Sequence, residues 1–538
     1  MKNPVERRQM LATAGIGALL LTGASHAGGA IKAGKILEVA LAADIAGLDI
    51  GSDVAAIRTA GFRVIGLGGA LYVPVERGNE NLPILTSRDG RRFRLADDEL
   101  SAIRPEVFGA LGNASVEIAS DNQSAKVIGD DDSNAISMAI RLAIQCASVV
   151  VLGARKYRIA KPLEPITSAM AIVGAGSLKT WLVVDPGMQG DAISVIETWL
   201  GKDPTEIGPA NKMVAQPDGQ STGVTLSGFT LSGFRSASGP QNGIMLYERN
   251  DNVYISDVEV RHIKGRGFCS GISRRSPPVS LLRESRIDRF QVRRCGDNER
   301  GLPAFELSSD GFRPHDDASN NISITDLLVI YSSDRAVVMD NRNAAHDMRY
   351  IVITGAYIEG ADRDVWTVRG SVSDLEVYGF DLNGSRNPDA AALLFEASDR
   401  DAFTRPPRRC YFSGAFGPVV NGIKVRHGKA LYFRLTSNGA SGTSVAVEKT
   451  CSGPVKFDGS GEERVWRFKV DPQVAHFVTV ESGQRTWSIN AMPNAAALFN
   501  SLIVVRQSGD GQCALARSDG RDWHSVSLQK MSLPGKPS

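Results

Sequence analysis

The chain has 538 residues, a formal net charge of +2, 55 glycines and an aromatic content of 7%. By length alone it has room for about three or four globular domains. Many glycines with few aromatic residues favour a turn-rich β protein, and the nearly balanced charge gives no sign of a nucleic-acid partner. None of the six cysteines belongs to a Cys-x-x-Cys pair, which disfavours a metal bound through sulfur. We expect no metal and no other cofactor.

The N-terminus has the layout of a secretory signal. Arg7 and Arg8 precede the apolar run Ala12–Gly23, and Ser25-His26-Ala27 supplies a small-x-small cleavage site. The apolar run is too short to span a bilayer permanently. The paired arginines resemble a twin-arginine export signal, which carries proteins that are already folded. We therefore predict a signal peptide over residues 1–27 and an exported, periplasmic or extracellular protein without a membrane span.

Residues 28–100 are expected to form a small N-terminal α/β module. Leu37–Leu48 has the pattern of a short helix or linker, and Asp53–Arg63 has the pattern of a helix. Short apolar segments predict strands around a polar tip, at Phe62–Leu67, Ile84–Thr86 and Arg92–Leu95.

A helix is predicted after this module. The glycine- and aspartate-rich loop Gly129–Asn134 is followed by the amphipathic stretch Ala135–Ala147. This pattern predicts a helix for which Asp132 or Ser133 supplies the N-cap. The three clustered aspartates of the loop are therefore expected to be turn and cap residues rather than metal ligands.

One eight-residue pattern then recurs six times: apolar, any, apolar, any, any, apolar, any, apolar. Alternation of period two predicts a strand with one buried face, and the extra central residue predicts a bend. Such a unit recurring every few dozen residues is typical of the stacked coils of a β-solenoid, which we assign to residues 101–400. Residues 401–538 are expected to be β-rich, as a separate C-terminal domain or as last irregular coils. The copies are Val224–Leu231, Val253–Val260, Ser285–Val292, Ile322–Val329, Ile351–Ile358 and Leu375–Leu382.

The segment ahead of the repeats resembles the opening of the pectate-lyase-like β-helix superfamily. Pro105–Ala110 contains a Phe-Gly-Ala turn, and the expected helix is followed by the Tyr-containing strand Lys156–Ile159 and the turn Gly174-Ala175-Gly176. The resemblance implies an all-β, right-handed parallel β-helix with a helix that caps its N-terminal end. The small module is similar to domains that precede β-helices in phage tailspikes and related depolymerases, which implies a homotrimer.

Residues 261–315 contain twelve basic and six acidic side chains, a surplus of six positive charges. Guanidinium groups bind carboxylates in a bidentate manner and stay charged at any ordinary pH. On an exported protein this surplus predicts an acidic polysaccharide partner rather than a nucleic acid, with Lys264, Arg274 and Arg275 as binding residues. About half of these arginines are expected to pair with nearby acids instead.

The loop Ser308–Asp317 gathers one of the seven histidines of the chain with three carboxylates. A carboxylate can orient a histidine as a base near neutral pH. We predict His315 as the general base and Asp316 as its orienting group. Arg313 would bind or neutralise an acidic sugar at the catalytic site, and Asp317 is predicted as a substrate-binding residue.

This loop is also similar to catalytic segments of two β-helix families. Gly311–Asp316 resembles the catalytic loop of mannuronan epimerases, which implies a catalytic role for its histidine. Ser309–Gly311, with Ser333-Asp334 one coil later, resembles the two acidic segments of polygalacturonases. That second resemblance implies hydrolysis by Asp310 and Asp334.

The arginine surplus favours β-elimination among these reactions. An arginine would neutralise the carboxylate of a uronic acid while a base removes the proton at carbon five. We therefore predict an exported lyase of an acidic polysaccharide. The alternatives are a uronan epimerase, a glycoside hydrolase with carboxyls about 6.5–9.5 Å apart, and a non-catalytic glycan-binding or surface-assembly protein.

Overall fold

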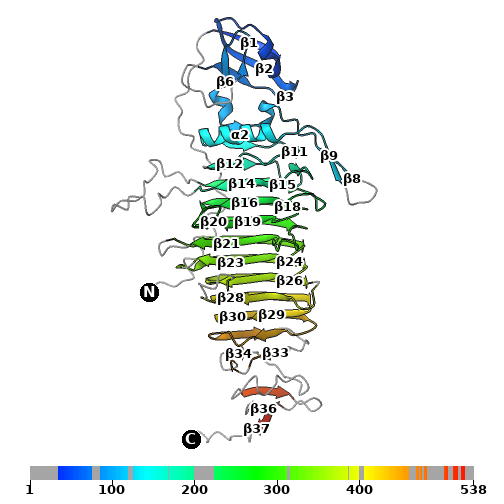
Figure 1. Cartoon of the computed structure of the whole chain (residues 1–538), viewed down its shortest axis with the longest axis vertical. Coiled ribbons are helices and arrows are strands. Elements are labelled where there is room, and N and C mark those ends of the chain that lie inside the picture. The colour runs from blue at the N-terminus through cyan, green and yellow to red at the C-terminus, as the bar shows by residue number, and fades with distance from the viewer. Residues whose placement is uncertain are drawn as a thin grey trace, which may run out of the picture. The chain divides into compact units, whose positions relative to one another are not determined.

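The computed structural model describes residues 34–75, 85–118, 125–167, 169–198, 223–311, 316–343, 345–385, 387–398, 405–459, 468–471, 473–474, 478–481, 502–506, 513–518 and 523–526. The chain divides into two compact units, which separate between Ala102 and Ile103 (Figure 1). The predicted signal peptide at residues 1–27 lies outside the described residues.

The first unit is a small β-sheet with the strand order β1-β2-β4-β6-β5 and β3 paired to β2. The predicted helix at Asp53–Arg63 is wrong, because β2 occupies this stretch and pairs in parallel with β1. Val54 and Ile57 are buried and β-branched, so the context of the sheet overrides the alanine-rich composition. The helices described in this unit are short 3-10 turns, which makes the module β rather than α/β. Its elements are β1 (Lys35–Leu41), η1 (Ala42–Gly47), β2 (Val54–Val64), β3 (Leu67–Gly68), β4 (Leu71–Pro74), β5 (Leu85–Thr86), β6 (Arg92–Leu95) and η2 (Asp97–Leu100).

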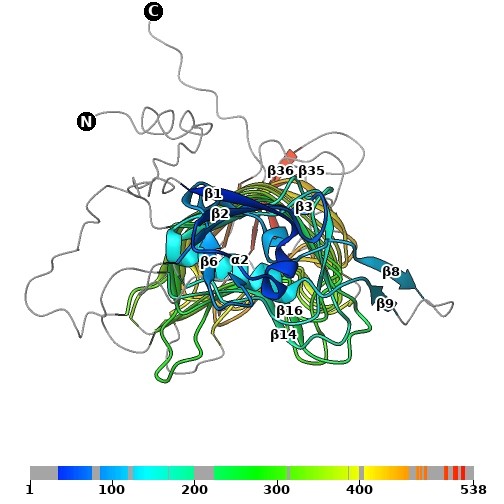
Figure 2. The same cartoon turned by 90° about the horizontal axis from the view of Figure 1, so that it is seen from above.

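The second unit is a right-handed parallel β-helix, as predicted. Its coils contribute strands to two long parallel sheets of sixteen and ten strands, and connections between parallel strands are right-handed in almost all proteins. Figure 2 shows the structure from above, down the long axis of Figure 1, and successive coils superpose in this view. The longer sheet contains β7 (Ala102–Ile103), β10 (Val149–Val151), β11 (Lys156–Ile159), β12 (Met170–Val173), β13 (Trp181–Val184), β15 (Val224–Ser232), β17 (Arg249–Asp251), β18 (Val253–Arg261), β20 (Leu281–Arg293), β22 (Asn320–Ser332), β24 (Met348–Ala361), β26 (Val372–Ser385), β28 (Arg408–Val419), β30 (Lys429–Ala440), β32 (Val455–Gly459) and β34 (Val478–Glu481).

The ten-stranded sheet forms a separate face of the same coils. Its strands follow one another in chain order, each paired in parallel with the next. They are β14 (Gly190–Ile196), β16 (Gln241–Tyr247), β19 (Phe268–Ile272), β21 (Phe305–Gly311), β23 (Val337–Asn343), β25 (Trp366–Gly370), β27 (Ala391–Glu396), β29 (Asn421–Val425), β31 (Val445–Val447) and β33 (Phe468–Val470). Two short antiparallel sheets complete the described strands: β8 (Ser115–Ile118) with β9 (Ala125–Ile128), and β35 (Leu502–Arg506), β36 (Cys513–Ser518) and β37 (Trp523–Val526).

The six copies of the repeat stack on one another in register. The third position of each copy pairs with the third position of the next, so that their side chains form one buried column through the core. This column is Leu226, Ile255, Ile287, Ile324, Ile353 and Val377. Burial of these columns drives the stacking, because each coil alone would leave its apolar face in water.

At the predicted central bend, the residue in the fifth position of every copy has the left-handed backbone conformation. A positive φ there lets two strand segments lie on different faces of the coil while apolar side chains point inward on both. Three of the six are glycine and two are aspartate, which reach this conformation more easily than most residues. The six residues are Gly228, Asp257, Arg289, Asp326, Gly355 and Gly379, with φ between 47° and 70°.

The helix α2 (Ser133–Cys146) lies at the first coils of the solenoid, as predicted (Figure 1). Its buried face includes Ile136 and Ile140, and it packs against η3 (Pro105–Phe108) and β10. Asp132 occupies the N-cap position, but its carboxylate accepts the backbone amides of Leu111 and Arg158 instead of capping the helix. These bonds tie the start of the helix to the backbone at Leu111 and Arg158, and the helix covers the end of the stack.

The solenoid continues beyond the boundary predicted at residue 400. Strands β28, β30, β32 and β34 extend the longer sheet, and β29, β31 and β33 extend the shorter one. The segment after 401 therefore begins as further coils rather than as a separate domain. Among the described residues, no helix is long and apolar enough to cross a membrane.

Candidate functional site

Most of the predicted site residues lie at the carboxyl ends of neighbouring strands of the ten-stranded sheet, in the connections that follow them. We call this row of connections the edge. Arg274 and Arg275 follow β19, Asp316 and Asp317 follow β21, and the corresponding connection one coil later follows β23. The connections are neighbours, because Asp310 pairs with Arg342 in register and forms a bridge with Ser280. Residues 312–315 lie outside the described residues, and with them the predicted Arg313 and His315.

Three predicted aspartates lie at this edge in different environments. Asp310 lies near the end of β21, and its side chain points away from the core of the coil but is buried. Asp316 is also buried. Asp317 is more open, and one of its carboxylate oxygens lies 3.4 Å from Nη1 of Arg283. Arg283, which lies on β20 of the coil between them, also binds Asp251 at 2.8 Å, so it links the connection after β16 to the connection after β21.

The two predicted binding arginines are held by acids from earlier coils. Nη2 of Arg274 donates to Asp191 at 2.7 Å, and its guanidinium lies 3.6 Å from the centre of the Tyr247 ring. Arg275 is paired with Glu197, and both arginine side chains remain about half exposed. They can contact a ligand, but they do not present unneutralised charge.

The charge surplus of the basic region is thus largely cancelled in the folded chain. Eight of the ten arginines within residues 261–311 form ion pairs, more than the expected half, and several partners lie outside that stretch. Lys264, the third predicted binding residue, donates to the carbonyl oxygen of Ala237 at 3.3 Å. The strongly cationic surface expected from composition is absent among these described residues.

Asp334 is not brought together with Asp310. It lies in the turn before β23, three residues ahead of Val337, whereas Asp310 pairs with Arg342 near the other end of that strand. The length of β21 from Phe305 to Asp310 alone separates the two ends by about 16 Å. Asp334 is fully buried and ion-paired with Arg363 at 3.2 Å. A two-carboxylate site built from Asp310 and Asp334 is therefore not formed.

Glu306 of β21 and Asp340 of β23 form a second pair of carboxylates that the sequence did not single out; both side chains point away from the core but are buried, each 2% exposed. Arg342 binds Glu306 through Nη2 at 3.0 Å and Asp340 through Nε at 2.8 Å. Arg266 binds the other oxygen of Glu306. Asp310 lies next to Arg342 in register, and against the effect of burial its charge adds to those of Asp340 and Glu306 in raising the pKa of the Arg342 guanidinium.

The environment moves the pKa values of this carboxylate pair in opposite directions. Burial raises the pKa of Glu306, but the charges of Arg266 and Arg342 outweigh it, and the pKa lies below its ordinary value. For Asp340, burial outweighs the bond to Arg342, and the pKa lies above its ordinary value. The Oδ1 atom of Asp340 has no hydrogen-bond partner among the described residues. A carboxyl group with a raised pKa therefore lies beside one with a lowered pKa.

The sequence signals one member of this pair, Glu306. Phe305 and Leu307 face the core, and the residues between and after them are Glu306, Ser308 and Asp310. Strict alternation places the second set on the outward face of one strand. The missing information is Asp340, which reaches the same surface only because β23 stacks in register with β21.

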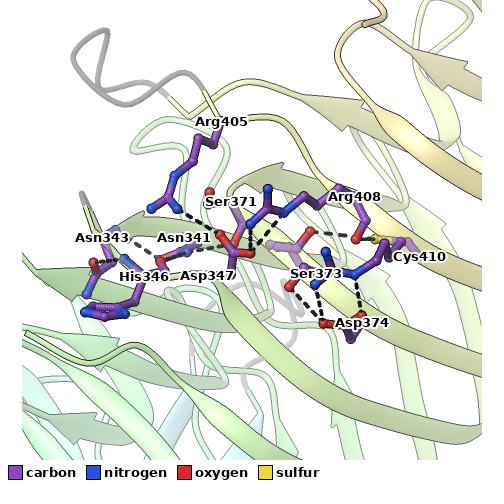
Figure 3. A network of polar contacts seen from close by, with 12 residues as sticks. Asn341, Asn343, His346, Asp347, Ser371, Ser373, Asp374, Arg405, Arg408 and Cys410 are labelled. Atoms are coloured by element: carbon purple, nitrogen blue, oxygen red, sulfur yellow. Dashed lines mark hydrogen bonds and ion pairs between the residues drawn. The ribbon is translucent and has the colours of Figure 1, made fainter. Parts of the chain in front are cut away.

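The edge continues as a polar network on the next coils (Figure 3). Asp347 accepts a hydrogen bond from Nε of Arg408 at 3.0 Å and pairs with Arg405 at 3.3 Å. Burial raises the pKa of Asp347, but the hydrogen bond and charge of Arg408 outweigh it, so the pKa lies below its ordinary value. These pairs join the connection after β23 to the segment ahead of β28.

Comparison with solved structures finds proteins of phages and bacteria. ORF18 of Geobacillus virus E2 is 12% identical with a TM-score of 0.47, over 94% of this chain and 93% of that chain. The enzymatically active domain of bacteriophage CBA120 tailspike protein 2 is 12% identical with a TM-score of 0.46, over 95% and 72%. The A-module of the Azotobacter vinelandii mannuronan C-5 epimerase AlgE4 is 16% identical with a TM-score of 0.35, over 70% and 99%. Likeness at this level does not extend to activity. No protein-family model and no curated protein sequence matches the chain.

Proposed function

We propose that this protein is an exported enzyme that modifies a polysaccharide at the paired carboxylates of β21 and β23. The observation that carries the proposal is the pair Glu306 and Asp340, which share Arg342 and have pKa values moved in opposite directions. Two carboxyls whose environments move their pKa values apart are the arrangement that acid–base cleavage of a glycosidic bond uses. The neighbouring edge, with its half-exposed arginines, supplies contacts for a sugar chain.

Hydrolysis is the reaction that this arrangement supports best. Protonated Asp340 would donate its proton to the glycosidic oxygen as the bond from that oxygen to the anomeric carbon breaks. Ionised Glu306 would accept a proton from the water that forms the new bond to the anomeric carbon. The products are a new reducing end and a free hydroxyl group, and a positioned acid or base contributes about 10²–10⁴-fold in rate.

Elimination from a uronate is the second candidate. The half-exposed Arg274 and Arg275 favour it, because both lie at the same edge and can contact an acidic sugar. Its general base would come from His315, with Arg313 and Asp316 beside it. It ranks second because eight of the ten arginines within residues 261–311 are already paired with acids.

A screen of acidic and neutral polysaccharides with mass spectrometry of the products separates the candidates. Hydrolysis gives new reducing ends without ultraviolet absorbance. Elimination gives an ultraviolet-absorbing unsaturated end, with products about 18 mass units lighter, which corresponds to one water. Epimerisation changes the sugar without shortening the chain. Glycan binding with no product in any reaction would favour the non-catalytic alternative.

Export through the twin-arginine route and assembly as a homotrimer also belong to this proposal. The export signal is supported by the residue pattern before Ala27. The trimer is supported by the sequence resemblance to the modules of phage tailspikes. Light scattering of the purified protein would measure a mass three times that of the mature chain if the trimer forms.

A further inference from the structure

One buried asparagine joins two successive connections of the candidate site. Nδ2 of Asn343 donates to the carbonyl oxygens of Asp316 and Asp317, each at 2.9 Å. Oδ1 of the same side chain accepts the backbone amides of Ala345 at 2.9 Å and His346 at 2.8 Å. Asn343 is 1% exposed, so these bonds form away from competing water.

A second asparagine on the same strand extends this contact to a third coil. Nδ2 of Asn341 donates to the carbonyl oxygens of His346 at 2.9 Å and Ser371 at 2.8 Å, and Oδ1 accepts the amide of Asn343 at 3.0 Å. Figure 3 shows both asparagines directed at the segment that carries His346. The backbone of His346 is thus held at its amide and at its carbonyl, beside the connection that carries Asp316.

We infer that Asn343 is a positioning residue that makes residues 316–319, after β21, and residues 345–347, after β23, one unit, and so fixes the edge along which a sugar chain binds. The inference rests on the proposed function for its catalytic consequence. Loops that carry site residues on a rigid scaffold need such anchoring, because a misplacement of about 1 Å can cost 10²-fold in rate. An asparagine suits this place because its amide donates to one connection and accepts from the other.

The variant Asn343→Asp separates the two halves of this contact. Its carboxylate still accepts the amides of Ala345 and His346, but it cannot donate to Asp316 and Asp317. At pH 7.5 it instead repels those carbonyl oxygens, and we expect kcat/KM to fall about 10²-fold. Burial raises the pKa of the introduced carboxyl. Below that pKa its proton can again be donated, so the ratio of variant to native activity should rise as the pH falls toward 5.

Asn298→Asp is the matched control. Asn298 is exposed in the turn before β21 and accepts a hydrogen bond from Nε of Arg363 at 3.1 Å. A carboxylate there keeps that bond, so its activity should equal that of the native protein at every pH. A role of Asn343 in stability alone would give activity that only follows the thermal midpoint at every pH. That result would overturn the inference.

Hydrogen–deuterium exchange tests the inference without activity. Each variant is compared with the native protein at the same pH, in peptides that cover residues 316–320 and 345–348. At pH 7.5, Asn343→Asp should speed exchange in the first peptide only, whereas Asn343→Leu should speed it in both. Unchanged or equal exchange in both peptides of the aspartate variant would contradict the positioning role. If no polysaccharide is modified but exchange behaves as expected, the proposed function fails and the positioning role stands.

Discussion

Gly311 leaves room for the side-chain amide of Asn343. A β-carbon at Gly311 would overlap Nδ2 of Asn343 and would lie 2.9 Å from Cβ of Asp316. The two residues pair in register on β21 and β23, so the close approach is fixed by the stack itself. The glycine that the sequence places in an Asp-Gly motif is therefore explained by packing at the edge of the site.

Gly311→Ala should displace the amide of Asn343 and loosen both connections that it holds. Forcing a methyl group into a packed site costs about 1–3 kcal/mol. The thermal midpoint should fall, and exchange should speed up around residues 316–320. Gly187→Ala is the control, because a β-carbon there meets only Oδ1 of Asp185 at 3.5 Å, an ordinary contact. Equal midpoints for the two variants would contradict the steric argument.

The carboxylate pair predicts opposite effects of pH on stability. The pKa of Glu306 is lowered on folding, so its contribution is present above its ordinary pKa and is lost as the pH falls through the folded value. Glu306→Gln removes the carboxylate that Arg266 and Arg342 share, with Asp340 still bound to Arg342, and should cost about 3–5 kcal/mol at pH 7. The difference from the native protein should narrow below pH 4. Unfolding midpoints measured between pH 3 and pH 8 test this.

Asp340→Asn should behave differently at the same guanidinium. The pKa of Asp340 is raised on folding, so its ionisation destabilises the fold as the pH rises through the folded pKa. Removing the ionisable group should leave the midpoint at pH 7 equal to or above that of the native protein. Activity should nevertheless fall about 10²–10⁴-fold, because the proton donor is gone. A fully active variant would remove Asp340 from the mechanism.

The stacking of the coils could be predicted from the sequence, and the point where the prediction stops has a physical cause. Where each residue of one coil pairs with one residue of the next, as Ile287 does with Ile324, the spacing of the apolar residues stays constant. A fixed eight-residue pattern therefore detects these coils. From β26 to β30 the register shifts at Phe380 and at Ala415, and each shift changes the spacing. The coils continue, but the pattern no longer matches.

The site could be predicted only where its parts lie close in sequence. The aspartates around Gly311 lie within eight residues of one another, so the sequence pattern identified them as a candidate site. The acid that holds Arg274 is Asp191, 83 residues earlier, so charge counted within a window overstated the positive surface. Asp340 reaches Glu306 through stacking and a shared arginine, which composition and spacing do not encode.

Export depends on Arg7 and Arg8 if the twin-arginine route is used. Replacing both with lysine should keep the protein in the cytoplasm, because that route reads the arginine pair. The native mature protein should begin at Gly28 after cleavage behind Ala27. Cell fractionation and the intact mass of the exported chain measure both outcomes. Export of the lysine variant at native levels would assign the signal to a different route.

Gly379 isolates the contribution of the left-handed bend. Its φ is +68°, and the nearest atom to an added β-carbon is the backbone nitrogen of Gly355 at 3.9 Å, so a side chain meets open space. Substitution there measures backbone strain without steric overlap. Asn, which enters this conformation more easily than most residues, should leave the thermal midpoint nearly unchanged. Val should lower the stability by about 1–2 kcal/mol, because its β-carbon crowds the following carbonyl oxygen. Equal midpoints for the Asn and Val variants would show that the bend tolerates any residue, and the preference for glycine and aspartate at the fifth position would then need another cause.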